Sequence, residues 1–302
     1  NCCHRSEDMT EEEVKELKDR APWRERKTIV FLSDFGYSDG AVSAMHGVAD
    51  QVDRTLKLED LTHEIPQFNI WEASYRLIQT VEYWAPGTVF VCVVDPGVGS
   101  ERESVAVLLS SGHIIVTPDN GTLSHVSKGI GIVERRRISE TTNRLKDSQK
   151  SYTFYGRDVY AYTGARLASG IISFDEVGPL LDNQVVMLEM NDPTVDNGKI
   201  TGSIDILDTR YGSIWTNISD TLFSDAGFKY GDRIRVDIEY RDRTVYGAVL
   251  PFCKNFTQVE KGESLIYVNS LLDVAIAVNQ GSFTDLYGVK TGEGWRISFK
   301  RC

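Results

Sequence analysis

The sequence predicts an α/β domain followed by a smaller all-β domain, and two observations carry this prediction. Up to about residue 190, apolar β-type runs alternate with amphipathic helical segments, which is typical of a layered, mostly parallel sheet with flanking helices. Beyond residue 198, short β-type runs separated by Gly, Asn and Asp follow one another, as in a barrel or sandwich. We therefore expect an N-terminal extension at 1–27, an α/β domain at 28–192 and an all-β domain at 198–302.

The individual elements can be assigned in chain order. A helix is expected over 10–20, with Thr10 as its N-cap. In the α/β domain we expect strands at 28–32, 56–61, 88–94, 104–109 and 113–117, and helices at 41–52, 71–84 and 158–169. Turn-forming residues at 192–198 mark the domain boundary. In the all-β domain the β-type runs are 199–207, 213–217, 233–240, 244–250, 264–268, 274–278 and 295–300.

Composition excludes several classes of function. The 302 residues include 33 basic and 44 acidic side chains, a net charge of -11, and the short basic run 135–137 is interpreted as a solvated strand end, so no nucleic-acid partner is expected. The five cysteines show no paired spacing of a zinc site or disulfide framework. No segment approaches the roughly 18–20 apolar residues that span a bilayer. We expect a cytoplasmic protein, or alternatively an exported lipoprotein anchored near Cys2 or Cys3.

Polar segments follow the first two predicted strands. Ligands of open α/β sheets bind outside the carboxyl ends of the strands, so Asp34 is placed to accept two hydrogen bonds from a ribose diol. Asp39, in the same segment, is either a second binding carboxylate or the N-cap of the next helix. The segment 60–66 contains His63 and Glu64, whose spacing fits no common zinc pattern, and His63 is interpreted as a hydrogen-bonded structural residue.

Three further segments carry candidate chemistry. A buried strand ends near Asp95, and Arg102 lies seven residues on, after a turn rich in Gly, so Arg102 can fold back onto the carboxylate. Such a pair keeps Asp95 ionised and can orient a water, or it only pins the turn. The segment 117–121 is typical of a turn. In 152–158, aromatic residues and Gly156 precede a helix start and can line the pocket of a flat ligand.

Taken together and in order, these segments resemble the S-adenosylmethionine (SAM) hydroxide adenosyltransferases, a family that also contains SAM-dependent fluorinases and chlorinases. The resemblance runs from about Ile29 to Lys300 and is most specific at Val-Val-Asp-Pro-Gly-Val-Gly, 93–99. It is supported by Asp-Phe-Gly (34–36), Thr-His-Glu-Ile (62–65), Pro-Asp-Asn-Gly (118–121), Thr-Phe-Tyr-Gly-Arg-Asp (153–158) and Tyr-Val-Asn-Ser (267–270).

The resemblance implies cleavage of SAM by water at the ribose C5′ carbon, giving adenosine and methionine, with SAM as substrate and neither a cofactor nor a metal. Asp95 and Arg102 match two members of the water-activating triad of the hydrolytic branch, and Tyr155 stands where its His is usual. The expected substrate-binding residues are Asp34, Asp39, Phe68, Phe154, Gly156, Asp208, Tyr211, Phe256 and Ser270. The family also implies a homotrimer, with each site between the α/β domain of one subunit and the β domain of the next.

Two alternatives remain open. Tyr155-Gly156 is similar to the chlorinase pattern, which would make a halide the nucleophile. However, halogenases replace the turn after Asp95 with a Tyr-containing one, and the Asp95 carboxylate repels an anion. The absence of His at position 155 also fits a protein that binds SAM or adenosine without turnover.

Overall fold

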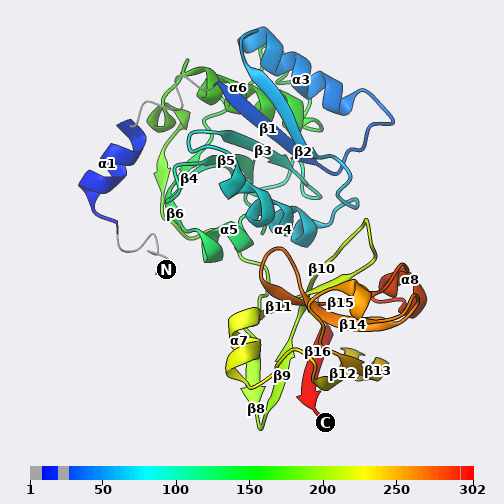
Figure 1. Ribbon diagram of the computed structural model, residues 1–302. Helices are drawn as coiled ribbons and strands as arrows, with labels where there is room; N and C mark the ends of the chain where they lie inside the picture. Colours follow the sequence, from blue (N-terminus) through cyan, green and yellow to red (C-terminus); the bar gives the residue numbers. More distant parts are fainter. Residues whose placement is uncertain (1–8, 20–26, 293) are drawn as a thin grey trace. The chain divides into compact units, whose positions relative to one another are not determined.

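The computed structural model describes residues 9–19, 27–292 and 294–302, which fold as two compact units (Figure 1). Unit 1 extends to Leu188, and unit 2 runs from Glu189 to Cys302. Cys2 and Cys3, the residues of the lipoprotein alternative, lie outside the described residues. The turn formers at 192–198 belong to unit 2, where they build a hairpin between β8 (Thr194–Asp196) and β9 (Lys199–Gly202).

Unit 1 is built on a seven-stranded sheet with the strand order β2-β1-β3-β5-β4-β6-β7. The strands are β1 (Thr28–Ser33), β2 (Lys57–Thr62), β3 (Val89–Val93), β4 (Ser104–Leu109), β5 (Ile114–Pro118), β6 (Ile132–Arg137) and β7 (Leu180–Leu181). The sheet is mixed: the pairs β2–β1, β1–β3 and β3–β5 are parallel, whereas β5–β4, β4–β6 and β6–β7 are antiparallel. The four residues between β4 and β5 can form a hairpin but not a parallel crossover, which needs a dozen residues or more.

Helices cover both faces of this sheet (Figure 1). Residues of α3 (Ala41–Val52) and α6 (Tyr162–Ser169) pack on one face, and those of α4 (Ile70–Thr80) and α5 (Ser124–Gly129) pack on the other. Strand side chains alternate between the two faces, so Phe31 joins the first cluster and Leu32 the second. Gly164 allows α6 to approach β3 closely, since a Cβ there would lie 2.4 Å from Cγ2 of Val91.

Several local features of unit 1 differ from the expected elements. The helix expected over 71–84 ends as α4 at Thr80 and continues as the 3-10 turn η2 (Val81–Tyr83). The helix expected over 158–169 begins earlier, as the π-helical turn η3 (Gly156–Ala161), and continues as α6. Arg135 is buried and not solvated, because its guanidinium pairs with the buried carboxylate of Asp119 at 2.6 Å.

The N-terminal helix α1 (Glu11–Asp19) packs against unit 1. Thr10 caps it as expected, with its hydroxyl accepting a hydrogen bond from the Glu13 amide at 3.2 Å. Lys18 forms ion pairs with Glu134 at 2.7 Å and Asp175, in the 3-10 turn η4 (Phe174–Val177), at 2.8 Å. The expected helix end at Arg20 lies outside the described residues.

Unit 2 consists of two antiparallel sheets with the strand orders β10-β11-β15-β14 and β13-β12-β16-β9-β8. Besides β8 and β9, the strands are β10 (Ile204–Leu207), β11 (Ile214–Ser219), β12 (Arg233–Tyr240), β13 (Arg243–Pro251), β14 (Ser264–Val268), β15 (Asp273–Val278) and β16 (Trp295–Arg301). Buried residues of both sheets, such as Ile276 and Phe299, belong to one apolar cluster. The short helices α7 (Asp220–Asp225), η5 (Phe256–Gln258) and α8 (Phe283–Tyr287) were not anticipated, because so few residues show no helical periodicity. Within the described residues, none of the helices is both long and apolar enough to cross a membrane.

Candidate functional site

Two carboxylates emerge at the same edge of the unit 1 sheet. Strands β1 and β3 are parallel neighbours with Ser33 paired to Val93, so Asp34 and Asp95 follow the carboxyl ends of adjacent strands. Burial raises the pKa of Asp34 above its usual value, and the negative charge of Asp95 raises it further, while the Phe68 amide acts in the opposite direction. This carboxyl edge is where α/β sheets bind ligands.

Arg102 folds back onto Asp95, as the sequence suggests. Its Nε donates to Oδ1 and Oδ2 of Asp95 at 3.0 and 3.2 Å, and a terminal nitrogen donates to Oδ2 at 2.5 Å. The two side chains are only 11% and 5% exposed, so both charges are largely removed from water. The intervening turn depends on Gly99, whose φ of 78° lies in the left-handed region. The pair is a bidentate, charge-assisted contact that fixes the orientation of the carboxylate.

The Arg102 guanidinium lies against aromatic and hydroxyl groups. Its remaining terminal nitrogen donates to Oγ of Ser104 at 3.2 Å, and that hydroxyl lies 2.9 Å from the Tyr160 hydroxyl. The guanidinium carbon is 4.8 Å from the ring centre of Tyr155 and 5.8 Å from that of Tyr160. Burial works to lower the pKa of Arg102, but the hydrogen bonds and charge of Asp95 raise it above its usual value, so Arg102 stays charged.

Tyr155 contacts the Asp95–Arg102 pair through its ring. Burial raises the pKa of its phenol, and a hydrogen bond from the phenol to Glu140 raises it further, against the opposing effect of Arg144. The hydroxyl is therefore neutral. In this arrangement the ring of Tyr155 lies between the guanidinium groups of Arg102 and Arg144, whose carbons are 4.8 and 5.2 Å from its centre.

The expected aromatic neighbours gather around the turn after β1. The Phe35 and Phe154 rings meet edge to face, with centroids 5.8 Å apart. Gly156 is buried beside them, because a Cβ there would lie 3.3 Å from the Phe35 ring. Phe68 is 58% exposed with a φ of 66°, and its amide donates to Oδ2 of Asp34 at 2.8 Å. An apolar, partly open surface thus borders the Asp34 carboxylate.

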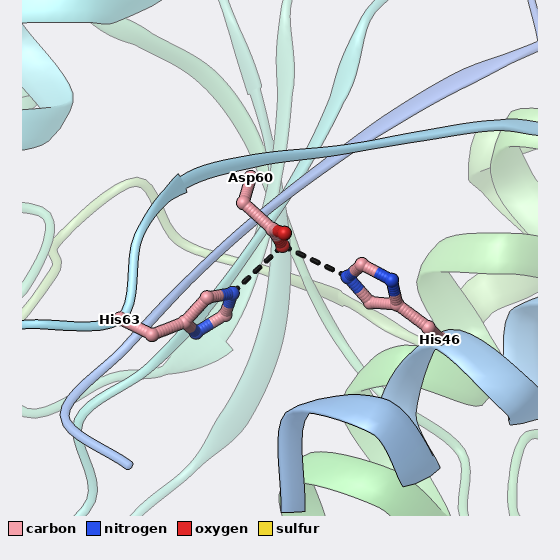
Figure 2. Close-up of side chains that lie close together, drawn as sticks. All are labelled: His46, Asp60 and His63. Atoms are coloured by element: carbon pink, nitrogen blue, oxygen red, sulfur yellow. Dashed lines mark hydrogen bonds and ion pairs between the residues drawn. The ribbon is translucent and has the colours of Figure 1, made fainter. Parts of the chain in front are cut away.

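A hydrogen-bonded chain supports the same turn from the other side. Oγ of Ser33 lies 2.6 Å from Nδ1 of His63. Nε2 of His63 lies 2.7 Å from Oδ1 of Asp60, as Figure 2 shows. The same carboxylate oxygen lies 2.8 Å from Nε2 of His46, on α3. Although Ser, His and Asp are the residue types of a hydrolase triad, Ser33 is 0% exposed and cannot reach a substrate. The sequence motif indicated His63 as structural, but not Asp60 or His46 as its partners.

The remaining expected residues of unit 1 have local structural contacts. Oδ1 of Asp39 accepts from the Ala41 amide at 2.9 Å, so Asp39 holds the start of α3. In the turn 117–121, Nδ2 of Asn120 donates to the Val94 carbonyl at 2.8 Å and thereby fixes the chain just before Asp95. Asn120 was missed as a site residue because the turn-forming character of its segment masked this contact.

In unit 2, two of the four expected site residues, Asp208 and Phe256, lie near Tyr267. The Tyr267 ring lies 5.0 Å from that of Phe256, and Asp208 is close enough for its charge to raise the pKa of Tyr267, to which burial contributes most. Tyr211 is 62% exposed, three residues after Asp208, and Ser270 is exposed after β14. Tyr267 itself was not expected as a site residue, although it begins the string Tyr-Val-Asn-Ser.

A separate cavity of about 690 Å³ lies beside α1 in unit 1 and is lined in part by Val14, Lys18 and Phe174. It shares no residue with the strand-end site. The charged groups in its lining include Lys18, which is neutralised by its ion pairs with Glu134 and Asp175.

Two ionisable carboxylates lie at adjacent strand ends, one of them fixed by a buried arginine, and make the carboxyl edge of the sheet in this α/β protein the candidate site for a small ligand. The chain matches the model of the SAM hydroxide adenosyltransferase N-terminal domain over residues 29–178 and that of the C-terminal domain over 202–296. The chain therefore belongs to the SAM hydroxide adenosyltransferase family.

Individual relatives agree with this assignment. A Methanocaldococcus jannaschii protein named (R)-S-adenosyl-L-methionine hydrolase is 34% identical over 80% of this chain and 84% of its own length. A protein of Actinopolyspora mzabensis named fluorinase is 26% identical over 90% of this chain and 97% of its own. A crystal structure of an uncharacterized conserved protein from Thermotoga maritima superposes with a TM-score of 0.83, at 32% identity, covering 90% of this chain and all of the other.

Proposed function

We propose that this protein hydrolyses SAM to adenosine and methionine. The buried Asp95–Arg102 pair is the observation that carries the proposal, because a halide site requires that no carboxylate repel the anion. The relative named as a hydrolase shares 34% of its aligned residues with this chain, against 26% for the fluorinase. The carboxylate of Asp95 and the higher identity to the relative named as a hydrolase both favour water as the nucleophile.

In the proposed reaction, the oxygen of a water attacks C5′ of the ribose in line with the sulfonium. The C5′–S bond breaks and its electron pair stays on sulfur, so methionine leaves as a neutral thioether. Asp95 accepts the proton of the attacking water and later passes it to solvent, which balances the reaction as SAM and water giving adenosine, methionine and a proton. Much of the rate comes from positioning the reactants. We assign that task to Arg102, which orients Asp95, and to Tyr155, whose ring lies against Arg102.

Substrate binding is assigned to residues of both units. Asp34 would accept hydrogen bonds from the ribose hydroxyls, with Phe68, Phe154 and Gly156 around the adenosyl group. The family resemblance adds Phe256 as a further wall near the adenosyl group, Asp208 and Ser270 for the methionine part, and Tyr211 as an aromatic neighbour. We further propose that the two sheets of unit 2 form a sandwich and that three chains assemble, each unit 2 completing the site of a neighbouring chain. Light scattering of the purified protein tests the trimer directly.

The decisive experiment is incubation with SAM in water labelled with oxygen-18, with and without chloride or fluoride. We expect adenosine carrying the label at its 5′ oxygen, at a rate that halide does not change. A dominant 5′-halogenated deoxyadenosine would instead make the protein a halogenase. Tight binding of SAM or adenosine without any product would make it a binding protein, an outcome favoured by the neutral Tyr155 phenol at the position where His is usual.

A further inference from the structure

A cluster of two histidines and one aspartate lies on the β2 side of unit 1. His46 comes from α3, Asp60 from β2 and His63 from the segment that follows β2 (Figure 2). One ligand atom of each residue lies within 4.8 Å of the other two. The reaction proposed above uses none of the three, so the cluster needs its own explanation.

The cluster offers the donor set of a transition-metal site. Two imidazole nitrogens and one carboxylate oxygen suit Zn²⁺ and similar divalent ions, whereas Mg²⁺ and Ca²⁺ prefer oxygen ligands alone. We propose that His46, Asp60 and His63 bind one divalent transition-metal ion of the zinc type. This departs from the expectation of no metal, which rested on the reaction that the resemblance implies and on the spacing of His63 and Glu64, and which did not consider His46.

The spacing of the donors allows this with a small adjustment. Oδ1 of Asp60 lies 2.8 Å from Nε2 of His46 and 2.7 Å from Nε2 of His63. Ligand bonds of about 2.0–2.1 Å to one ion place neighbouring donors roughly 3 Å apart, so these two contacts would open by a few tenths of an ångström. The two imidazoles would also move toward each other. His46 can follow by side-chain rotation, since its side chain is 29% exposed on the outer part of α3.

Ser33 supplies the supporting contact that metal-binding histidines usually have. Its hydroxyl lies 2.6 Å from Nδ1 of His63, and the His63 side chain is 0% exposed, so the ring is locked in one orientation. Without an ion, Nε2 carries the ring proton and donates to Asp60, because a carboxylate only accepts. With an ion on Nε2, the proton moves to Nδ1, which then donates to Oγ of Ser33. A hydroxyl can serve in either direction, so Ser33 satisfies both forms of the ring.

The cluster is also accessible from solvent. The side chains of Asp60 and His46 are 27% and 29% exposed, which leaves an entry path and room for water at the remaining ligand positions. Three protein ligands with open positions are the arrangement of zinc sites that keep a bound water. Glu64, next to His63 and exposed, adds negative charge nearby.

An ion here would stiffen the turn that carries Asp34. The Gly36 amide donates to the His63 carbonyl at 2.8 Å, and the Phe35 amide donates to Oγ of Ser33 at 3.2 Å. The ion would tie α3, β2 and the segment after β2 together around these two contacts. We therefore expect the ion to act on ligand binding through the turn, and not to supply the nucleophile.

Zinc titration of chelator-treated full-length protein, followed by calorimetry, tests the site in the absence of SAM. The wild-type chain should bind one more equivalent of Zn²⁺ than His46→Gln. Losing even an outer partner of a ligand costs about 10–100-fold in affinity, so His46→Gln should weaken this site by more than about a hundredfold. Co²⁺ should give a visible absorption band in the wild-type protein that His46→Gln lacks. Asp50→Asn, which removes an exposed carboxylate from the same helix, is the matched control and should bind as the wild type does.

Two further measurements keep the outcome unambiguous. Asp60→Asn retains a hydrogen-bond acceptor for the imidazoles, so metal-free Asp60→Asn should melt like the wild type and still lose the extra equivalent. Zn²⁺ that binds to cysteines elsewhere in the chain would still bind to His46→Gln. The difference between the wild type and His46→Gln therefore counts only the ion at the proposed site. Identical zinc titrations of the wild type, His46→Gln and Asp60→Asn would overturn the proposal and leave a hydrogen-bonded cluster. Because binding is measured without SAM, this result does not depend on whether the protein is a hydrolase.

Discussion

Replacing Asp95 with Asn tests the central assignment most sharply. Asn keeps the shape of the side chain but removes the negative charge and the proton acceptor. Turnover should fall by about a hundredfold or more, which corresponds to about 2.7 kcal/mol of lost transition-state stabilisation. SAM binding should change little, so the effect should appear in kcat and not in KM.

The same substitution should also destabilise unit 1. Arg102 is only 11% exposed and would lose its carboxylate partner, and breaking a buried pair in this way costs about 3–5 kcal/mol. We expect the lower end, about 3 kcal/mol, because Asn can still accept one hydrogen bond from Arg102. For a unit of this size the melting temperature should fall by roughly 6–12 °C. Circular dichroism then defines a temperature at which both proteins are folded, and turnover is compared there by chromatography of adenosine.

Glu103→Gln is the matched control, because it breaks a bidentate Glu–Arg contact to Arg137 one residue from Arg102. That pair is exposed, with side-chain exposures of 38% and 50%, so neither turnover nor melting should change appreciably. Wild-type turnover in Asp95→Asn, with the expected loss of stability, would refute the catalytic role and leave Asp95 as a structural residue.

Further predictions concern three other residues, Tyr155, Asp34 and Asp273. Tyr155→Phe should keep turnover within about threefold, because the ring contact with Arg102, worth about 0.5–1 kcal/mol, is retained; a hundredfold loss would show that the hydroxyl acts on the water. Tyr155→His should add a pH dependence of turnover near about pH 6–7. Asp34→Asn should raise KM for SAM by about tenfold or more through the lost charge-assisted hydrogen bonds. In the wild type SAM affinity should fall on acidification at a pH above the usual Asp value, because the pKa of Asp34 is raised; an affinity independent of pH would contradict this. In unit 2, burial and the charges of Asp205 and Asp220 raise the pKa of Asp273 to about 7. A raised folded-state pKa means that stability is lost as pH rises from about 4 to 7, so Asp273→Asn should stabilise unit 2 by about 2 kcal/mol at pH 8 and little at pH 4, as denaturant titrations would show.

The parts of the fold that local patterns encode were predictable. The helix at 41–52 and the strands at 104–109 and 233–240 have the expected bounds, because apolar periodicity and turn residues determine them locally. Strand direction in the sheet was not predictable in the same way. An apolar run such as 104–109 has the same sequence pattern in a parallel and in an antiparallel pair. The short hairpin to β5 determines that this strand runs antiparallel to its neighbour.

The site shows the same division. The Asp95–Arg102 contact follows from one short turn and could be inferred from the eight residues 95–102. The surroundings of Tyr155 depend on Glu140 and Arg144, which come from a segment without regular structure. His46 belongs to a helix whose buried face was assigned to apolar residues, and only the packing of α3 beside β2 brings it to Asp60. Contacts between distant segments leave no local signal.

The π-helical turn η3 has a consequence for how this region tolerates change. Such a turn is equivalent to one extra residue inserted into an α-helix. Since each residue of an α-helix rotates the chain by about 100°, a uniform helix here would swing Tyr155 away from Arg102 or Gly164 away from β3. Because the π-helical turn accommodates one extra residue, one continuous helix can place Tyr155 against Arg102 at its start and Gly164 against β3 further along. By the same reasoning, a regular α-helix with one residue fewer between 156 and 161 would keep Tyr155 and Gly164 in the same relative phase.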